Sequence, residues 1–221
     1  MSGAVALHAP DSPRFHEALA AILGREPDEA LRPALPYSAV VENCSSQAIA
    51  LVGVRFSMTG RRGRNMSVIH FADTLRNPER TEFAPGAFRF FCAEPAYAAM
   101  AIRGTSEPGL RATMNLKNLR SMVSVRASVD CFAFDDGRFL GPDTGGAFER
   151  FAKQRASEQA MIAEVISGQL TEQNLPKQLN SSDPARRALA RKLCDALGAG
   201  GGEAMLECAR KHRCRIELVK A

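Results

Sequence analysis

Two cysteines and a histidine near the end of the chain are of the residue types that bind zinc. Cys208 and His212 are four residues apart, so on a helix they share one face, and Cys214 follows two residues later. Thiolate and imidazole are preferred zinc ligands, but a structural site needs four ligands, and Cys194 would have to supply the fourth. We expect no cofactor and keep zinc at Cys208, His212 and Cys214 as the alternative. The competing interpretation is two buried thiols beside a basic helix end.

Four aspartates lie close together in the sequence: Asp130, Asp135, Asp136 and Asp143. Carboxylates at short spacing can bind calcium or work as an acid–base pair. Their spacing does not match a calcium-binding EF-hand loop. A hairpin turn with Gly137 accounts for Asp136, and a helix cap at Asp143 or Thr144 accounts for the last of them. We therefore interpret these aspartates as structural.

Other patterns for catalysis or phosphate binding are weak. The chain has no G-x-S-x-G motif, and the spacing of Cys44 and His70 gives no reason to pair a thiol with an imidazole. The glycine-rich segment 198–202 precedes a helix, but it follows another helix rather than a strand, and no lysine follows it. A helix C-cap joined to a linker explains these glycines. The sequence therefore predicts no catalytic residue, and an enzyme is the less favoured interpretation.

Positive charge is concentrated in the last third of the chain. Residues 150–221 hold 13 Lys and Arg against 8 Asp and Glu, whereas residues 1–149 hold 16 of each sign. We expect Arg210, Lys211, Arg213 and Arg215 to bind another protein. Weak, non-specific nucleic-acid binding is a further interpretation, but the chain has no Trp and two Tyr, so side chains on which bases could stack are scarce.

Charged residues also interrupt an apolar stripe on a predicted helix. Arg155, Glu158 and Gln159 fall on the same arc as Phe151 and Ile162. A charge on a packing face must be paired or must reach solvent. We favour an Arg155–Glu158 ion pair at the rim between helix and sheet over a polar notch where a ligand or partner inserts.

Several segments alternate between apolar and polar residues with a period of two, which predicts the strands that position these residues. The 221 residues are 45% hydrophobic and 24% charged, which is typical of a globular chain. Met122–Phe134 alternates strictly, with Val129, Cys131 and Ala133 on the apolar face. Together with shorter alternating runs it predicts an antiparallel β-sandwich in an α+β protein. The other predicted strands are Tyr37–Glu42, Ile49–Met58, Met66–Phe71, Phe88–Cys92 and Arg138–Leu140.

Helices are predicted before and after this sandwich. Ser12 and Pro13 begin a short helix that Gly24 ends. A second helix runs over residues 146–167, a third over 184–197 and a fourth over 203–213, with a possible strand at 214–219. Segment 93–118 fits loop or helix, and the first eight residues, with His8, are expected to be frayed. We divide the chain into 1–36 (helix and Pro-rich connection), 37–140 (sandwich) and 141–221 (helical section).

Short motifs resemble those of uncharacterised bacterial proteins with an immunoglobulin-like sandwich. They are Glu42–Ile49, Val54–Phe56, Pro85-Gly86 and Asp135–Asp143, the last leading directly into a helix. The resemblance implies an immunoglobulin-like fold and no known active site.

The resemblance implies export as well, whereas residues 1–8 lack the features of a signal peptide, so we expect a cytoplasmic protein. No apolar run approaches the roughly 20 residues of a membrane span. We predict a non-catalytic interaction or accessory module, with a metal-binding or enzymatic domain as the alternative.

Overall fold

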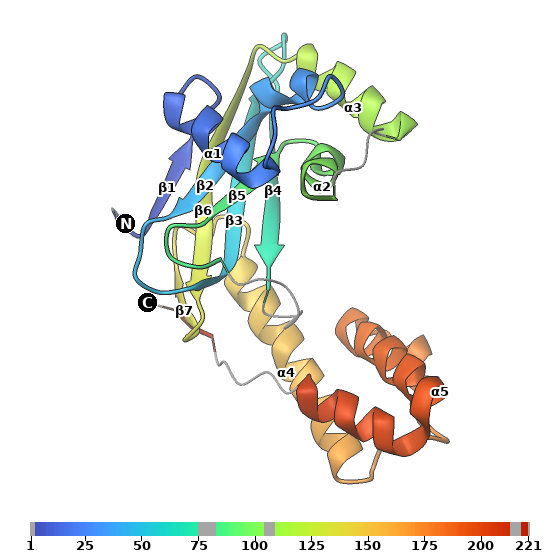
Figure 1. The fold of residues 1–221 in the computed structure, drawn as a ribbon. Helices are drawn as coiled ribbons and strands as arrows, with labels where there is room; N and C mark the ends of the chain where they lie inside the picture. The colour runs from blue at the N-terminus through green and yellow to red at the C-terminus, as the bar shows by residue number, and fades with distance from the viewer. Residues whose placement is uncertain (1–2, 75–82, 104–108, 213–217, 221) are drawn as a thin grey trace. The chain divides into compact units, whose positions relative to one another are not determined.

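The structure is a computed structural model that describes residues 3–74, 83–103, 109–212 and 218–220 (Figure 1). The chain is an α+β protein, as predicted. It divides into two compact units, each of which is described by itself. Among the described residues, the first unit ends at residue 145 and the second begins at 146.

The first sheet consists of three antiparallel strands in the order β1-β2-β5. They are β1 (Val5–His8), β2 (Ser38–Asn43) and β5 (Phe88–Cys92). The expectation of a frayed N-terminus is wrong, because Val5 to His8 pair with β2. The apolar side chains of Val5 and Leu7 pack against the core, and Nε2 of His8 lies 2.8 Å from Oε2 of Glu42.

The second sheet contains four strands of the first unit, in the order β4-β3-β6-β7. Their bounds are β3 (Ile49–Thr59), β4 (Asn65–Asp73), β6 (Ser124–Phe134) and β7 (Arg138–Leu140). All pairings among these four are antiparallel. β3 is buried on both faces at its start, and Ser57 near its end is exposed, as the sequence pattern predicts.

The predicted strict alternation along β6 is wrong at one residue. Gly53 pairs with Cys131 while the next residue, Val54, pairs with Val129, so Asp130 is an extra residue in the ladder. Such a β-bulge shifts the side chains that follow it to the opposite face. Phe132 therefore joins Val129 on the apolar face between the sheets, and Cys131 faces the other side.

Two apolar clusters hold the first unit together. Neighbouring residues of the first sheet point to opposite sides: Val41 and Phe91 join Phe56 and Phe132 between the sheets. On the other side, Val40 and Phe90 pack against short helices (Figure 1). These helices are α1 (Pro13–Leu23), η1 (Arg32–Tyr37), α2 (Pro95–Arg103) and α3 (Leu110–Arg120). The ambiguous segment 93–118 thus contains α2 and most of α3, and α1 has the predicted bounds.

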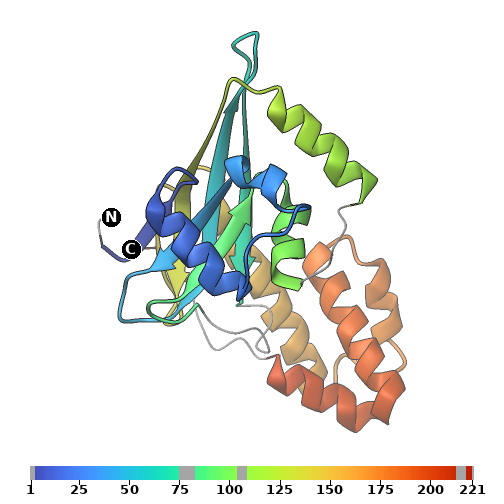
Figure 2. The same cartoon turned by 45° about the horizontal axis from the view of Figure 1, so that its top comes forward.

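The second unit is built from α4 (Ala147–Ile166), η2 (Leu175–Asn180) and α5 (Pro184–Lys211), followed by β8 (Val219–Lys220). The predicted break in α5 falls at Gly200 and Gly201, whose backbone angles are not helical. Figure 2 shows the change of direction there. The apolar faces of α4, η2 and both parts of α5 form one core, which includes Ile162, Leu175, Leu193 and Met205.

The predicted helix cap at Asp143 or Thr144 needs correction. The N-cap position of α4 is Gly146, in a left-handed conformation. Thr144 instead donates hydrogen bonds to Asp130 from its hydroxyl and its backbone N–H.

The predicted final strand at 214–219 falls mostly outside the described residues. Within the described ranges, every helix falls short of the length and hydropathy that crossing a bilayer requires.

Candidate functional site

The residues predicted to bind zinc are only partly described. Cys208 is half-buried at the edge of the second unit's core. His212 ends α5, and its Nε2 lies 3.7 Å from Oε2 of Glu158. Cys214 lies outside the described residues, so the zinc site at these residues stays a prediction. Among the residues that the structure describes, neither Cys208 nor His212 belongs to a group of three close metal-ligating side chains.

The predicted protein-binding residues are also described in part. Arg210 and Lys211 are exposed at the end of α5, while Arg213 and Arg215 lie outside the described ranges. Nζ of Lys211 lies 2.8 Å from Oε1 of Glu207, one helical turn earlier, and this pairing lowers the pKa of Glu207. The partner-binding role of this basic end stays a prediction.

The charged residues on the stripe of α4 are buried. Arg155 and Glu158 are 8% and 6% exposed. Oε1 of Glu158 accepts a 2.9 Å hydrogen bond from the amide of Gln154. Burial of both residues differs from the predicted position at a rim, where the charged ends would reach solvent.

A groove of about 650 Å³ opens between the first half of α4 and the start of α5. We call it the α4–α5 groove. All its lining residues belong to the second unit: Arg150, Lys153, Gln154, Ser182, Asp183, Pro184, Ala185 and Ala188. The volume is within the range of ordinary ligand sites. Sequence reasoning missed this groove because its two walls are about 30 residues apart in the chain.

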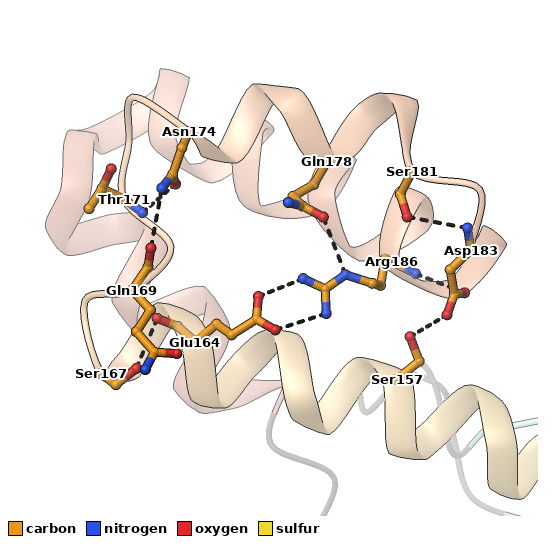
Figure 3. A network of polar contacts seen from close by, with 10 residues as sticks. All are labelled: Ser157, Glu164, Ser167, Gln169, Thr171, Asn174, Gln178, Ser181, Asp183 and Arg186. Atoms are coloured by element: carbon orange, nitrogen blue, oxygen red, sulfur yellow. Dashed lines mark hydrogen bonds and ion pairs between the residues drawn. The ribbon is translucent and has the colours of Figure 1, made fainter.

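The carboxylate of Asp183 connects the start of α5, one wall of the groove, to α4, the other wall. Asp183 is the N-cap of α5, and its Oδ1 accepts hydrogen bonds from the N–H groups of Ala185 (2.8 Å) and Arg186 (3.4 Å). Its Oδ2 accepts a 2.6 Å hydrogen bond from Ser157 of α4 (Figure 3). These bonds, that from Ser157 first, hold the pKa of Asp183 below its ordinary value despite opposing desolvation. The cap was predicted from Asp183-Pro184, but the contribution of Ser157 was not.

Arg186, three residues into α5, joins all three helical segments of the unit. Its guanidinium donates two hydrogen bonds to the carboxylate of Glu164 on α4, at 3.1 and 2.5 Å. Its Nε donates a third, of 3.2 Å, to Oε1 of Gln178 on η2 (Figure 3). A guanidinium that binds a carboxylate at both oxygens fixes orientation as well as distance. The walls of the groove are therefore held in one arrangement.

The exposed charge of the groove is positive. Arg150 and Lys153 lie one turn apart on the exposed face of α4. The carboxylate of Asp183 is already used by the cap and by Ser157. The start of a long helix adds a partial positive charge. Pro184, Ala185 and Ala188 give the groove an apolar wall. This arrangement suits a ligand that has acidic and apolar groups.

A second cluster could hold a metal ion. Oxygen atoms of Asp130 and Asp143 and the sulfur of Cys131 lie within 4.8 Å of one another in the first unit. Sequence reasoning assigned the two aspartates to structure and did not connect them with Cys131.

The fold and the groove define an α+β protein that has a sheet-rich unit and a helical unit with a basic groove. Comparisons with known protein families, with curated proteins and with solved structures found no match. The resemblance to immunoglobulin-like bacterial proteins therefore stays a prediction.

Proposed function

We propose that this chain is a non-catalytic binding module that holds an acidic segment of another protein in the α4–α5 groove. The observation that supports this most is the combination of exposed Arg150 and Lys153 with the capped start of α5 around one groove.

The chemistry of the lining favours binding over catalysis. The described residues that line the groove include no cysteine or histidine, and the carboxylate of Asp183 is engaged by three donors. The pKa of Asp183 is lowered, whereas a general acid at neutral pH needs a raised one.

Charge favours an acidic segment over a neutral one. Lys153 is exposed and none of the described residues forms an ion pair with it. A carboxylate of a partner would gain from this ammonium, from Arg150 and from the partial charge of the helix start. Apolar side chains of the same segment would cover Pro184 and Ala188. Hydrogen bonds from Ser157 to Asp183 and from Arg186 to Glu164 connect the two helices, which favours a groove that is formed before binding.

Three finer proposals accompany this one. We propose an immunoglobulin-like sandwich for the first unit on the strength of its two antiparallel sheets and shared core. Weak nucleic-acid binding through the basic end of the chain is the alternative partner class. Zinc at Cys208, His212 and Cys214 is the alternative site.

The test compares two charge reversals of equal size in the same unit. Tagged wild-type chain, Arg150→Glu/Lys153→Glu and Arg210→Glu/Lys211→Glu are used to capture partners from nuclease-treated native cells. Circular dichroism first establishes that each variant is folded. Should the groove double variant not fold, Lys153→Glu replaces it, since Lys153 is exposed.

The proposal expects one stoichiometric protein that the wild type and the 210/211 variant retain and the groove variant loses at least tenfold. Its bound segment, mapped by limited proteolysis, is rich in Asp and Glu. Loss of the partner in the 210/211 variant instead would assign binding to the basic end. A partner captured only in a parallel sample without nuclease treatment would favour nucleic acid and overturn the proposal.

A further inference from the structure

The β-bulge in β6 buries a carboxylate in the first unit. Asp130 is the inserted residue, and its side chain is 1% exposed. An ionised carboxylate so deeply buried is stable only when cations or hydrogen-bond donors surround it. Bulges commonly re-aim a side chain next to a functional site.

The two oxygens of Asp130 differ in their partners. Oδ1 accepts hydrogen bonds from the hydroxyl and the N–H of Thr144 and lies 3.6 Å from Nε of Arg55. Oδ2 is buried, and neither it nor Nε of Arg55 has a hydrogen-bond partner among the residues that the structure describes. A buried oxygen without a partner destabilises the folded chain, so a ligand that coordinates it would remove this penalty.

The turn after β7 brings a second carboxylate to Asp130. Asp143 has a positive φ of 49°, and its N–H donates a 3.0 Å hydrogen bond to the carbonyl of Asp130. Gly141 makes this approach possible, because a Cβ there would come within 2.5 Å of the same carbonyl oxygen. The glycine and the left-handed aspartate thus hold the turn directly against the bulge.

The bulge also turns Cys131 away from the core between the sheets. Its sulfur and oxygens of Asp130 and Asp143 lie within 4.8 Å of one another. We propose that these three side chains bind one divalent transition-metal ion, with zinc as the best match, and that the ion coordinates the unpartnered Oδ2 of Asp130. The site is independent of the α4–α5 groove, which belongs to the other unit.

The donor set and the local charge favour zinc over calcium or magnesium. Calcium and magnesium take oxygen ligands, whereas a thiolate selects softer metals such as zinc. Two carboxylates and a thiolate carry three negative charges, and a divalent cation with the Arg55 guanidinium carries three positive ones. A divalent cation therefore offsets much of the negative charge that the three ligands carry. Water or one further side chain supplies the fourth ligand that tetrahedral zinc requires.

Binding requires the loss of one proton. The thiol of Cys131 gives its proton to the buffer as its sulfur binds the metal, so affinity rises with pH. Thr144 acts as a positioning residue, because its hydroxyl orients the carboxylate of Asp130 through Oδ1.

The test measures metal bound to the full chain rather than an activity. The purified chain is stripped with chelator, dialysed, and titrated with zinc or cobalt under reducing conditions. Metal content is measured by mass spectrometry, and cobalt bound to a thiolate shows a charge-transfer band in the near ultraviolet. Variants are Cys131→Ser and Asp143→Asn, with Cys44→Ser as the control for an exposed thiol and Cys208→Ser/His212→Gln for the other candidate site.

The proposal predicts one zinc per chain, a cobalt–thiolate band, and at least a 100-fold loss of affinity in Cys131→Ser, with both controls like the wild type. Loss of zinc affinity in Cys208→Ser/His212→Gln but not in Cys131→Ser would place the metal site at α5 and overturn the proposal. A folded chain that binds no stoichiometric metal at any tested pH would show that solvent alone satisfies Asp130, and would overturn it as well. Asp143→Asn keeps the test valid if Cys131→Ser does not fold.

Discussion

Ser157 on α4 donates a 2.6 Å hydrogen bond to Oδ2 of Asp183, the residue that caps α5. The same carboxylate therefore closes the first turn of one helix and ties it to the middle of another. Because Asp183 also lines the α4–α5 groove, this contact connects the stability of the helical unit with the shape of its binding surface.

Replacing either partner should lower the stability of the helical unit. Ser157→Ala removes one hydrogen bond and should reduce the free energy of unfolding by about 1 kcal/mol. Asp183→Ala also removes the N-cap and should cost about 2 kcal/mol. Urea unfolding followed by the helical circular dichroism signal measures both. Equal stability of all three proteins would show that the contact contributes nothing.

The Ser157–Asp183 contact predicts how the stability of the chain changes at acid pH. The pKa of Asp183 is lowered in the folded chain, chiefly by Ser157, so its stabilisation is present above the ordinary aspartate pKa of about 3.9 and is lost as pH falls through the lower folded value. Ser157→Ala, with a smaller lowering, should lose less stability than the wild type below about pH 4. Parallel pH profiles of the two proteins would contradict this.

Two glycines in α5 should respond with opposite sign to the same substitution. Gly201, at φ 70° and ψ −163°, adopts a conformation that alanine avoids, so Gly201→Ala should destabilise by about 1–3 kcal/mol. Gly198 lies in the regular part of the helix with open space around it, so Gly198→Ala should stabilise by about 0.5–1 kcal/mol. Thermal unfolding of both variants distinguishes a true break from a continuous helix, in which both changes would stabilise.

Two glycine substitutions separate the cost of a steric clash at the bulge from the cost of a positive φ alone. Gly86 and Gly141 both have positive φ, but space is open at Gly86, whereas a Cβ at Gly141 would meet the Asp130 carbonyl and the Cys131 Cα. Gly86→Ala should cost about 1 kcal/mol and Gly141→Ala at least about 3 kcal/mol. Similar costs in chemical denaturation would argue against close packing of the turn on the bulge.

Thiol reactivity offers a check on burial in the first unit. Burial raises the pKa of Cys92 to about 12, whereas Cys44 is exposed. At pH 8, iodoacetamide should modify Cys44 within minutes and should leave Cys92 intact until the chain unfolds, because the thiolate is the reactive form. Peptide mass spectrometry reads both sites in one sample. Early modification of Cys92 would contradict its burial.

Local patterns predicted most strands and helices well. Alternation located β3, β5 and β7, and the Ser12-Pro13 start with the Gly24 stop located α1 within a residue. β1 was missed because four residues contain too little pattern; its pairing with β2 depends on contacts distant in sequence. The bulge was missed because the residues 129–131 alternate without interruption in the sequence, and only the pairing with Gly53 and Val54 reveals the extra residue.

The candidate sites were harder to predict for the same reason. Asp183 was identified as a cap from its own neighbours, but its groove needs α4, and Ser157 gave no signal. Asp130 and Asp143 each had a local explanation, so nothing suggested that a turn would bring them together with Cys131. Functional groups that depend on contacts between distant segments are not visible in residue spacing.

The most direct measurement of the central claim is a photo-cross-link from inside the groove. A photoreactive phenylalanine derivative is placed at Ala188, which lines the groove, and in a second protein at Arg210, on the basic end of α5. Each protein is irradiated in its native cells, and the cross-linked peptide is sequenced by mass spectrometry. We predict that position 188 captures one Asp- and Glu-rich protein segment that position 210 does not. Capture from position 210 alone, or of nucleic acid from position 188, would contradict the account.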